Sequence, residues 1–463
     1  MDPRFLPHNS HRENPGGFST NDPQLKHLAG CPFRHRSALL DRLPRRTSGI
    51  FTLGGGRQTG KSTLLKQWMA ELLQDGVLPM AVSYLTGELI DDHHSLMRHI
   101  EDHLAAVPHG EFNYLIVDEV TYIRGWDMAV KYAADAGMLD STALVVTGSD
   151  LSFLQEARVR FPGRRGDAAV NDYHLRPLSF REFVGLEGKV TAAADQFEEP
   201  FDLSDQAVDL IFDAFDRYLL HGGYLTAIND MAAHGAIRQS TLATYSDWIR
   251  GDVLKRGKQE AYLREVLSAI VTRYTSQVTW NGLAQDLSID HPKTIADYVE
   301  LLERMDAVAI VPALREDKLG PAPKRARKLT FCDPFILHAV RAWLAPSTDP
   351  FENQVLAASQ DPVWASQIVE ACVANHFKRF FPTYYIKAQG EVDIAYVRDG
   401  RFWPVEIKWT TQLRPKTLKQ IARYTNGVIW SKSRHVGQIE GVDVRPLPIE
   451  LLRIGQETRA GYG

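Results

Sequence analysis

The chain has 463 residues, of which 44% are hydrophobic and 24% charged, the composition of a soluble globular protein with about three domains. Its net charge of -4 excludes a uniformly basic surface, so any surface that attracts nucleic acid must be local. The cysteines, Cys31, Cys332 and Cys372, are far apart, which excludes both a disulfide framework and the spacing of a zinc site. No apolar run is long enough to cross a membrane, and the N-terminus has no apolar signal core. We therefore expect a cytoplasmic protein without a membrane partner.

The N-terminal part of the chain changes character after about thirty residues. Residues 1–30 are polar and rich in Pro, Asn and His, so we expect them to be poorly ordered. From residue 31 to residue 190, short apolar runs alternate with helical patterns, which predicts an α/β domain with a parallel sheet. The expected strands are residues 49–54, 78–85, 113–119, 143–149 and 173–179.

The first expected strand leads into GGRQTGKS, residues 55–62, which fits the phosphate-binding pattern G-x-x-x-x-G-K-[ST]. A helical pattern begins near Lys61, so the loop also has the strand and helix that this motif requires. Its glycines allow backbone N–H groups to point at phosphate oxygens. We expect Lys61 to reach the β and γ phosphates of ATP and Ser62 to bind Mg²⁺. The predicted cofactor-binding residues of the loop are Gly55, Gly56, Arg57, Gln58, Thr59, Gly60, Lys61, Ser62 and Thr63.

Polar side chains also end the third and fourth expected strands. The apolar run at residues 113–119 ends in Asp118 and Glu119. Parallel strands deliver their carboxyl ends to one edge of the sheet, where ligands bind. We therefore expect Asp118 to support Mg²⁺ and Glu119 to activate the attacking water. Thr147 and Ser149 end the next strand, either as hydroxyls that sense the γ-phosphate or as ordinary turn residues.

Two arginines, Arg164 and Arg165, lie in the glycine-containing loop RVRFPGRRGD that precedes the fifth expected strand. An arginine in such a loop can stabilise the charge of a phosphoryl-transfer transition state, either in its own chain or in a neighbouring subunit of a homo-oligomer. The alternative is a solvated basic loop.

Beyond the sheet, the pattern becomes mainly helical. Residues 190–206 are acidic and without periodicity, which predicts a linker or insertion. Residues 207–267 predict helices that are broken at HGGY, residues 221–224. Residues 268–345 predict a helix-turn-helix unit with a following strand pair, and residues 345–354 predict another linker.

The helix-turn-helix pattern leaves its partner open. In a DNA-binding unit of this kind, the N-terminal residues of the second helix contact base edges. Those residues are His291, Lys293 and Thr294. The acids of the same helix, which would repel phosphate, are Asp297, Glu300 and Glu303. The basic residues of the following segment, which can neutralise phosphates, are Lys324, Arg325, Arg327 and Lys328. Both DNA binding and a subunit-contact module fit this distribution of charge.

A cluster of acids is expected near the C-terminus. Residues 390–410, GEVDIAYVRDGRFWPVEIKWT, predict a β-hairpin in which Glu406 and Lys408 leave the same face of one strand. Asp393, on the partner strand, can share a divalent metal with Glu406, and hard oxygen ligands suit Mg²⁺ or Mn²⁺. Lys408 would then lie beside the attacking water or the scissile phosphate, while Glu370 from an upstream helix would complete the metal site. The alternative is cross-strand charge pairing alone.

The motifs GGGRQTGKSTLL, LIVDEV, VVTGS, PGRRGD and RPLSFREF occur in this order. Together they resemble a family of bacterial and archaeal AAA+-like P-loop ATPases that are fused to a winged helix and then to a restriction-endonuclease-like domain. The resemblance implies a P-loop ATPase core at residues 31–190 with the sheet order 5-1-4-3-2. It further implies a helical lid at residues 207–267, a winged helix at 268–345 and a nuclease-like α/β domain at 355–455.

The C-terminal residues are similar to the PD-(D/E)xK nuclease superfamily. The residues that carry this resemblance are Glu370, Asp393, Glu406, Lys408, Gln420 and Tyr424. The last two are expected one helical turn apart, as in the RecB-like branch, and Val392 stands where the family usually has Pro.

These features lead to one hypothesis and two alternatives. The hypothesis is a Mg²⁺-dependent ATPase that binds DNA and carries a metal-dependent nuclease-like domain, in DNA processing, mobile elements or defence. One alternative is an ATP-driven switch or scaffold that binds a protein partner or DNA and has a catalytically silent nuclease fold. The other is a DNA-binding ATPase whose nuclease-like fold only grips DNA.

Overall fold

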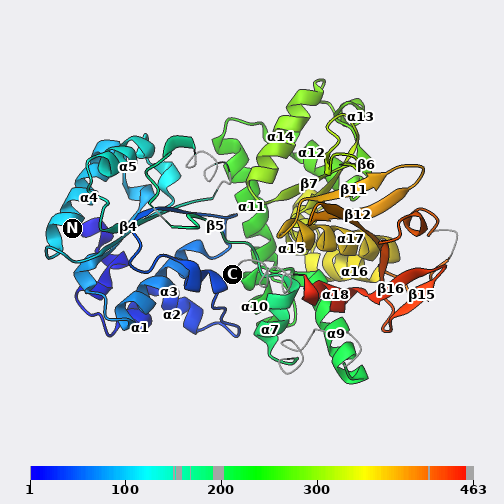
Figure 1. The fold of residues 1–463 in the computed structure, drawn as a ribbon, viewed down its shortest axis with the longest axis horizontal. Coiled ribbons are helices and arrows are strands. Elements are labelled where there is room, and N and C mark those ends of the chain that lie inside the picture. Colours follow the sequence, from blue (N-terminus) through cyan, green and yellow to red (C-terminus); the bar gives the residue numbers. More distant parts are fainter. Residues whose placement is uncertain are drawn as a thin grey trace. The chain divides into compact units, whose positions relative to one another are not determined.

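The computed structural model describes residues 2–149, 152, 159–166, 168–190, 203–414 and 418–454 (Figure 1). The chain forms two units, which are described one at a time. The first consists of residues 1–176 and 304–306, and the second of residues 177–303 and 307–463.

The first unit contains one parallel sheet whose strand order is β2-β3-β4-β1-β5. The strands are β1 (Gly49–Gly54), β2 (Val82–Thr86), β3 (Asn113–Asp118), β4 (Thr142–Gly148) and β5 (Asp172–His174). Each overlaps the strand expected from the apolar runs, and the expected order 5-1-4-3-2 is confirmed. β1, β3 and β4 are buried along their whole length, as expected for parallel strands that are covered on both faces.

Helices cover both faces of this sheet. They are α2 (Pro23–Ala29), α3 (Lys61–Gln74), α4 (His93–Ala106) and α5 (Trp126–Asp135). Leu115 and Val117 of β3 pack with the side chains of α4 and α5 in one apolar core. Tyr114 and Ile116, which point to the opposite face, pack with α2 and α3 in another. The alternation along one strand therefore separates the two cores.

The prediction that residues 1–30 are poorly ordered is wrong. They form η1 (Pro3–His8), η2 (Ser10–Arg12), α1 (Phe18–Asn21) and α2. Phe5 and Phe18 are at most 1% exposed and belong to the two cores. The carboxylates of Asp2 and Asp22 cap η1 and α2, each of which starts with proline. Two aromatic anchors and two capped starts therefore order a segment whose average composition is polar.

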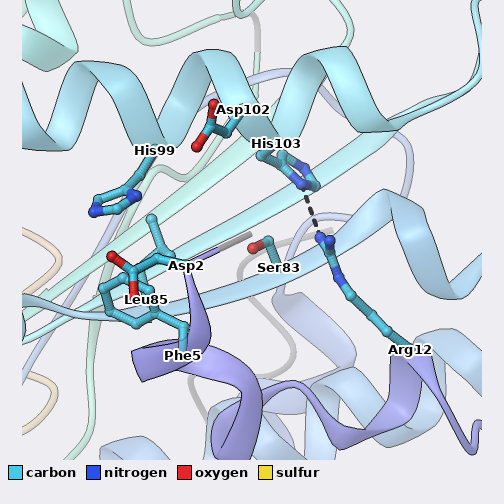
Figure 2. A pocket seen from close by; sticks show the side chains of 8 residues that line it. All are labelled: Asp2, Phe5, Arg12, Ser83, Leu85, His99, Asp102 and His103. Atoms are coloured by element: carbon cyan, nitrogen blue, oxygen red, sulfur yellow. Dashed lines mark hydrogen bonds between the residues drawn. The ribbon is translucent and has the colours of Figure 1, made fainter.

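The ordered segment packs against β2 and α4 and lines a small pocket there (Figure 2). The residues around this pocket are Asp2, Phe5, Arg12, Ser83, Leu85, His99, Asp102 and His103. The guanidinium of Arg12 bonds to Nδ1 of His103 at 3.2 Å. Burial lowers the pKa of His103 to about 3, so its ring is neutral beside this cation.

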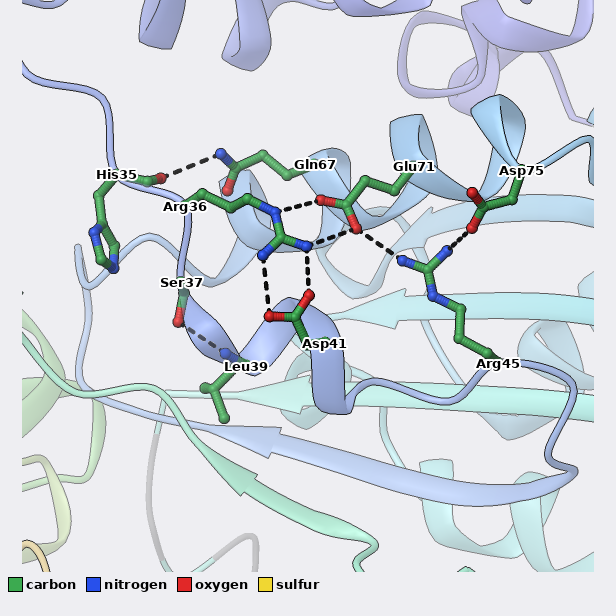
Figure 3. A network of polar contacts seen from close by, with 9 residues as sticks. All are labelled: His35, Arg36, Ser37, Leu39, Asp41, Arg45, Gln67, Glu71 and Asp75. Atoms are coloured by element: carbon green, nitrogen blue, oxygen red, sulfur yellow. Dashed lines mark hydrogen bonds and ion pairs between the residues drawn. The ribbon is translucent and has the colours of Figure 1, made fainter. Parts of the chain in front are cut away.

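Ion pairs hold the next stretch of chain onto α3 (Figure 3). Arg36 pairs with Asp41 in η3 (Ala38–Arg42) at 2.6 Å and with Glu71 of α3 at 2.8 Å. Arg45 pairs with the same Glu71 at 2.7 Å and with Asp75. The network is partly exposed, so its contribution to stability is modest, but it sets the path of the chain into β1.

The second unit begins with helices. They are α7 (Phe180–Glu187), α9 (Asp205–His221), α10 (Leu225–His234), α11 (Gln239–Lys255) and α12 (Glu260–Thr272). The expected break at residues 221–224 is confirmed, because α9 ends at His221 and α10 begins at Leu225. Gly222 between them has φ 55°, and a Cβ there would collide with the carboxylate of Asp333. Residues 191–202 of the expected linker lie outside the described residues.

The expected helix-turn-helix and strand pair follow. Their elements are β6 (Gln277–Val278), α13 (Trp280–Asp286), α14 (Pro292–Arg304), β7 (Val308–Pro312) and β10 (Arg327–Phe331). The three strands form an antiparallel sheet in the order β6-β10-β7, and β8 (Leu314–Arg315) pairs with β9 (Gly320–Pro321). The apolar stripe of α14 is buried as predicted, at Ile295, Tyr298, Leu301 and Leu302.

A mixed sheet forms the C-terminal part, in the order β11-β12-β13-β14-β16-β15. Its strands are β11 (Thr383–Lys387), β12 (Glu391–Arg398), β13 (Arg401–Lys408), β14 (Val428–Ser431), β15 (Gly437–Ile439) and β16 (Val442–Pro446). The predicted hairpin is β12–β13, closed by Asp399 and Gly400 with φ 52° and 69°.

Helices precede and follow this sheet. They are α15 (Pro334–Leu344), η8 (Phe351–Leu356), α16 (Ala357–Gln360), α17 (Pro362–Lys378) and α18 (Leu447–Arg453). η8 starts within the expected linker at residues 345–354. The expectation of a helix around Gln420 and Tyr424 is wrong, since the described residues there form only the 3₁₀ turn η10 (Ile421–Arg423). No helix in the described ranges has the length and apolar character needed to span a membrane.

The ordering of the N-terminal segment predicts a stability effect. Phe5→Ala removes a fully buried ring and should cost about 3–5 kcal/mol, seen as a lower urea midpoint by intrinsic fluorescence. Leu6→Ala in the same turn is the control, because Leu6 is 43% exposed and its loss should cost less than about 1 kcal/mol. Equal midpoints for the two variants would contradict the packing of this segment.

Candidate functional site

The predicted nucleotide-binding residues meet at the carboxyl edge of the first unit's sheet. The phosphate-binding loop connects β1 to α3, which begins at Lys61 as predicted. Gly55, Gln58 and Gly60 have φ of 152°, 59° and 98°, and a Cβ at Gly55 would collide with the carbonyl of Leu175. Left-handed residues interspersed with others are the backbone pattern from which anion-binding nests are built.

Lys61 is buried over this loop. Its Nζ donates hydrogen bonds to the carbonyl oxygens of Gly55 at 2.9 Å and Gly56 at 3.0 Å. It also lies 3.8 Å from Oε1 of Glu119. Burial lowers the pKa of Lys61, and the carboxylate of Glu119 opposes that shift. The predicted phosphate-binding cation and the predicted water-activating acid are therefore neighbours.

The carboxylate of Asp118 is the centre of the site. It is 5% exposed and accepts hydrogen bonds from Ser62 Oγ at 2.6 Å and Thr147 Oγ1 at 2.5 Å. A further hydrogen bond comes from the hydroxyl of Tyr84. The structure thus brings Ser62 and Asp118 together, as the predicted Mg²⁺ site requires. Tyr84 was missed by the sequence reasoning, although it lies in the strand next to that of Asp118.

The remaining predicted residues have identifiable contacts. Thr147 Oγ1 also accepts the N–H of Glu119 at 2.8 Å, so this hydroxyl contacts both acids. Thr59 donates to the carbonyl of Gly56 at 2.8 Å, and Arg57 donates to the hydroxyl of Tyr122 at 2.8 Å. Thr63 and Ser149 are half-buried.

The two candidate arginines are bound within their own chain. Arg165 donates to Asp172 at 2.5 Å, at the edge strand β5, and to the carbonyl of Asn171 at 3.1 Å. Arg164 pairs with Asp135 at the end of α5. Neither bond is with the phosphate-binding loop, so the geometry does not support a role at the nucleotide of the same chain. The role in a neighbouring subunit stays a prediction.

In the second unit, the basic segment is not uniformly exposed. Arg327 lies over the ring of Trp280 at 4.3 Å, and Arg325 donates to the carbonyl of Lys387 at 2.6 Å. Lys328 is 2% exposed and points into a group of carboxylates. The expectation that Lys328 contacts phosphate is therefore wrong, since an ammonium buried among acids is not available to DNA. Lys324 is exposed.

The predicted acidic residues of the C-terminal domain do form a cluster. Lys408 Nζ lies 2.5 Å from Glu406 Oε1 and 3.5 Å from Asp393 Oδ2. Asp393 Oδ2 also accepts the N–H of Ile407 at 2.9 Å. These contacts follow from the β12–β13 pairing, which places Asp393 beside the end of β13.

A second lysine enters the cluster from the other side. Lys328 Nζ lies 2.8 Å from Glu370, 2.5 Å from Glu391 and 3.8 Å from Asp393. The sequence analysis did not place Glu391 in this cluster, and it assigned Lys328 to contacts with phosphate instead. The alternation of strand β10 was the available signal, because neighbouring residues on a strand point to opposite faces and only one of Arg327 and Lys328 can face solvent.

Burial and mutual repulsion perturb the acids. Burial raises the pKa of Glu370 to about 7, despite the ammonium of Lys328. Burial and the neighbouring Asp393 raise the pKa of Glu406 to about 8, and Oε2 of Glu406 is buried with no hydrogen-bond partner. For Lys328, burial lowers the pKa, but the surrounding carboxylates outweigh it and the net shift is upward. This ammonium therefore stays charged.

The cluster has both favourable and unfavourable features for a divalent metal. The buried, unpartnered Oε2 of Glu406 and the hard oxygens of Asp393 and Glu370 suit Mg²⁺ or Mn²⁺. Within the described ranges, however, no three His, Cys, Asp or Glu side chains converge closely enough to hold a metal ion. Lys328 lies between Glu370 and Asp393, so these two acids contact an internal cation instead.

Comparison with known proteins identifies the first unit's domain. Residues 47–184 match the family model described as "AAA domain", and residues 212–347 match a "Domain of unknown function (DUF8612)". An "Uncharacterized protein" of Haemophilus influenzae is 23% identical over 270 residues, which cover 56% of this chain. The match spans 60% of that relative's length. The chain thus carries an AAA-type P-loop ATPase domain, which confirms the ATP-binding part of the prediction.

Two solved structures are similar to this chain at low sequence identity and low TM-score. The Walker-type ATPase of Pyrococcus abyssi matches with a TM-score of 0.42 and 14% identity, covering 63% of this chain and 91% of its own. The Aeropyrum pernix ORC1 protein, solved in complex with DNA, matches with a TM-score of 0.32 and 13% identity, covering 75% of this chain and 97% of its own.

Proposed function

We propose that the chain is a Mg²⁺-dependent ATPase that engages DNA through its second unit. The observation that carries the ATPase assignment is the hydrogen bond of 2.6 Å between Ser62 and Asp118, beside Lys61 and Glu119. Ser62 and Asp118 would hold the metal ion at the mouth of the phosphate-binding loop. When bound there, Mg²⁺ neutralises charge on the phosphate oxygens.

The ion pair between Lys61 and Glu119 suggests how the site becomes active. The ammonium of Lys61 contacts two carbonyl oxygens of the loop and lies near the carboxylate of Glu119. In this proposal the ammonium would bind the phosphates of ATP in preference to Glu119, because the phosphates carry several negative charges. Glu119 would then orient the attacking water and accept its proton. Its backbone N–H is held by Thr147, which fixes the position of the acid.

This assignment predicts that two variants separate binding from turnover. Lys61→Ala should lose nucleotide binding, measured with a fluorescent ATP analogue, because it removes the phosphate-binding cation. Glu119→Gln should keep binding and lose turnover by about 10²–10⁴-fold, measured as phosphate release, because the amide cannot accept a proton. Wild-type turnover in Glu119→Gln would contradict the role of Glu119.

For the second unit, we propose a DNA partner and a metal-dependent nuclease-like site. The exposed residues at the start of α14, His291 and Lys293, together with Lys324, support contacts with DNA. The approach of Asp393, Glu406 and Lys408 supports the nuclease-like site. A homo-oligomer is part of the proposal, because Arg164 or Arg165 would act on a neighbouring subunit's nucleotide.

In this proposal Asp393, Glu406 and Glu370 would hold Mg²⁺ or Mn²⁺. The bound ion would supply a Lewis acid for the phosphodiester and lower the pKa of water. Lys408 would stabilise the charge that develops on the phosphate. Its ammonium stays protonated because Asp393 and Glu406 raise its pKa, which burial alone would lower.

The nuclease-like site predicts a specific loss of DNA cleavage. Asp393→Asn should abolish Mn²⁺- or Mg²⁺-dependent cleavage of supercoiled and single-stranded DNA, because the amide is a poor ligand, while ATP turnover is kept. Asp399→Asn in the exposed turn of the same hairpin is the matched control and should cut like wild type. Absence of cleavage by the wild type under either metal would exclude the nuclease function.

The position of Lys328 favours a second candidate function for the same unit. Its ammonium contacts three of the cluster's acids and already neutralises part of their charge. If it stays there, the C-terminal domain is catalytically silent. The chain would then be an ATP-driven switch that binds a protein partner or DNA.

Metal binding by a Lys328 variant distinguishes the two candidates. With a silent site, wild type binds Mn²⁺ weakly, whereas Lys328→Met exposes the acids to the ion and gains affinity at least about tenfold, measured by calorimetry. Without metal the variant should be destabilised by about 3–5 kcal/mol, because buried carboxylates lose their counter-ion. Lys324→Met, an exposed lysine of the same segment, is the control. Equal affinities in wild type and Lys328→Met would exclude Lys328 as a competitor.

A further inference from the structure

Tyr84 contacts the same carboxylate oxygen as the predicted magnesium ligand. Its hydroxyl donates to Oδ2 of Asp118, which also accepts the hydroxyl of Ser62. Tyr84 is 2% exposed and Asp118 is 5% exposed, so neither group can exchange this bond for water. Together with Thr147 on Oδ1, the hydroxyl of Tyr84 restricts the carboxylate to one orientation.

The ring of Tyr84 lies against the buried ammonium group of Lys66. Lys66 of α3 is fully buried, and its Nζ lies 4.0 Å from the centroid of the Tyr84 ring. The same Nζ pairs with Asp22 at 3.1 Å and donates to the carbonyl of His8 at 2.6 Å. The His8 ring stacks on the Tyr84 ring with centroids 5.5 Å apart. Asp22 and His8 belong to the N-terminal segment, so this segment contacts both Tyr84 and the ammonium group of Lys66.

The backbone of Tyr84 is held by the same segment. β2 is an edge strand, so one side of its backbone has no strand partner in the sheet. Asn9 takes that place, because its Oδ1 accepts the N–H of Tyr84 at 2.8 Å and its Nδ2 donates to the carbonyl of Tyr84 at 2.7 Å. Asn9 is 1% exposed, so this amide is a fixed part of the edge.

We propose that Tyr84 is a positioning residue of the magnesium site and that the N-terminal segment, residues 3–29, acts on that site through it. The proposal rests on the proposed ATPase function. Tyr84 touches neither nucleotide nor metal in this scheme. It holds Asp118 in the orientation in which Oδ2 faces Ser62, and residues His8, Asn9 and Asp22 hold Tyr84.

The size of the effect follows from what the hydroxyl does. Partners that orient a metal-binding carboxylate change metal affinity or activity by about 10–100-fold when they are removed. Tyr84→Phe keeps the ring, its contact with Lys66 and its stacking on His8. It removes only the hydrogen bond to Asp118. The variant therefore tests positioning separately from packing.

The experiment measures Mg²⁺ dependence in the full chain. Tyr84→Phe should raise the Mg²⁺ concentration for half-maximal ATP turnover about tenfold, with unchanged binding of a fluorescent ATP analogue in EDTA. The matched control is Tyr114→Phe, which removes another buried tyrosine hydroxyl of the same sheet, one that accepts the N–H of Arg46. This control should have the Mg²⁺ dependence of wild type. An unchanged Mg²⁺ dependence in Tyr84→Phe overturns the proposal.

A second variant tests the link to the N-terminal segment. Asp22→Asn keeps the cap of α2, because asparagine caps as well as aspartate, but removes the charge that pairs with Lys66. It should shift the Mg²⁺ dependence in the same direction as Tyr84→Phe. A wild-type Mg²⁺ dependence in Asp22→Asn overturns the link to this segment.

Binding of the ATP analogue, measured without turnover, distinguishes failure of the proposed ATPase function from failure of the proposed role of Tyr84. Mg²⁺ should increase the affinity of wild type for the ATP analogue, and Tyr84→Phe should need about tenfold more Mg²⁺ for that increase. If wild type binds in this way but hydrolyses no ATP, the proposed function fails and the role of Tyr84 is still measured. If Mg²⁺ acts equally on both proteins, the role of Tyr84 fails whatever the turnover.

Discussion

The first unit depends on the burial of one charged group, the carboxylate of Asp118. An ionised carboxylate away from water is costly unless hydrogen bonds and nearby cations compensate it. Ser62, Thr147 and Tyr84 supply three hydrogen-bond donors, one from α3 and two from the strands on either side of β3. The order of the sheet is what makes these side chains neighbours, since β3 lies between β2 and β4. The polar edge of the sheet is therefore a consequence of strand order.

In the second unit, lysine ammonium groups compensate the buried carboxylates. Lys408 neutralises Glu406 and Asp393 from within the hairpin, whereas Lys328 reaches Glu370 and Glu391 from strand β10. Hydroxyl donors are neutral, so they do not cancel the negative charge of a carboxylate. A lysine ammonium group in contact with the carboxylate does cancel it. The carboxylate of Asp118 thus has hydroxyl partners, whereas the acids of the C-terminal cluster already contact two ammonium groups.

Much of this organisation could be predicted from the sequence, because apolar periodicity and glycine positions are local signals. The strands of the first sheet, the loop at residues 55–62 and the break at residues 221–224 follow from them. The order of the N-terminal segment could not, since it depends on Phe5 and Phe18 finding distant partners in the cores. Average composition is a poor guide where a few aromatic side chains supply most of the burial.

The residues of the candidate sites could likewise be predicted only where a local sequence pattern marks them. Motifs located Lys61, Ser62 and Asp118, because each lies in a short recognisable pattern, either the phosphate-binding loop or an apolar strand that ends in acids. Tyr84 and Lys328 carry no motif, and their contacts with the acids arise only because the fold places their strands beside those acids. The helical turn expected around Gln420 is a 3₁₀ turn, so spacing alone did not give the local conformation there.

The charge balance of the C-terminal cluster links its two candidate functions. Four carboxylates, those of Glu370, Glu391, Asp393 and Glu406, surround two ammonium groups, which leaves a formal charge of two negative. The raised pKa values of Glu370, about 7, and Glu406, about 8, mean that protons remove this charge near neutral pH. One divalent ion carries the charge of the two protons that it would replace. A metal ion at the proposed site would therefore compete with protons for the same acids, and movement of Lys328 would favour the metal.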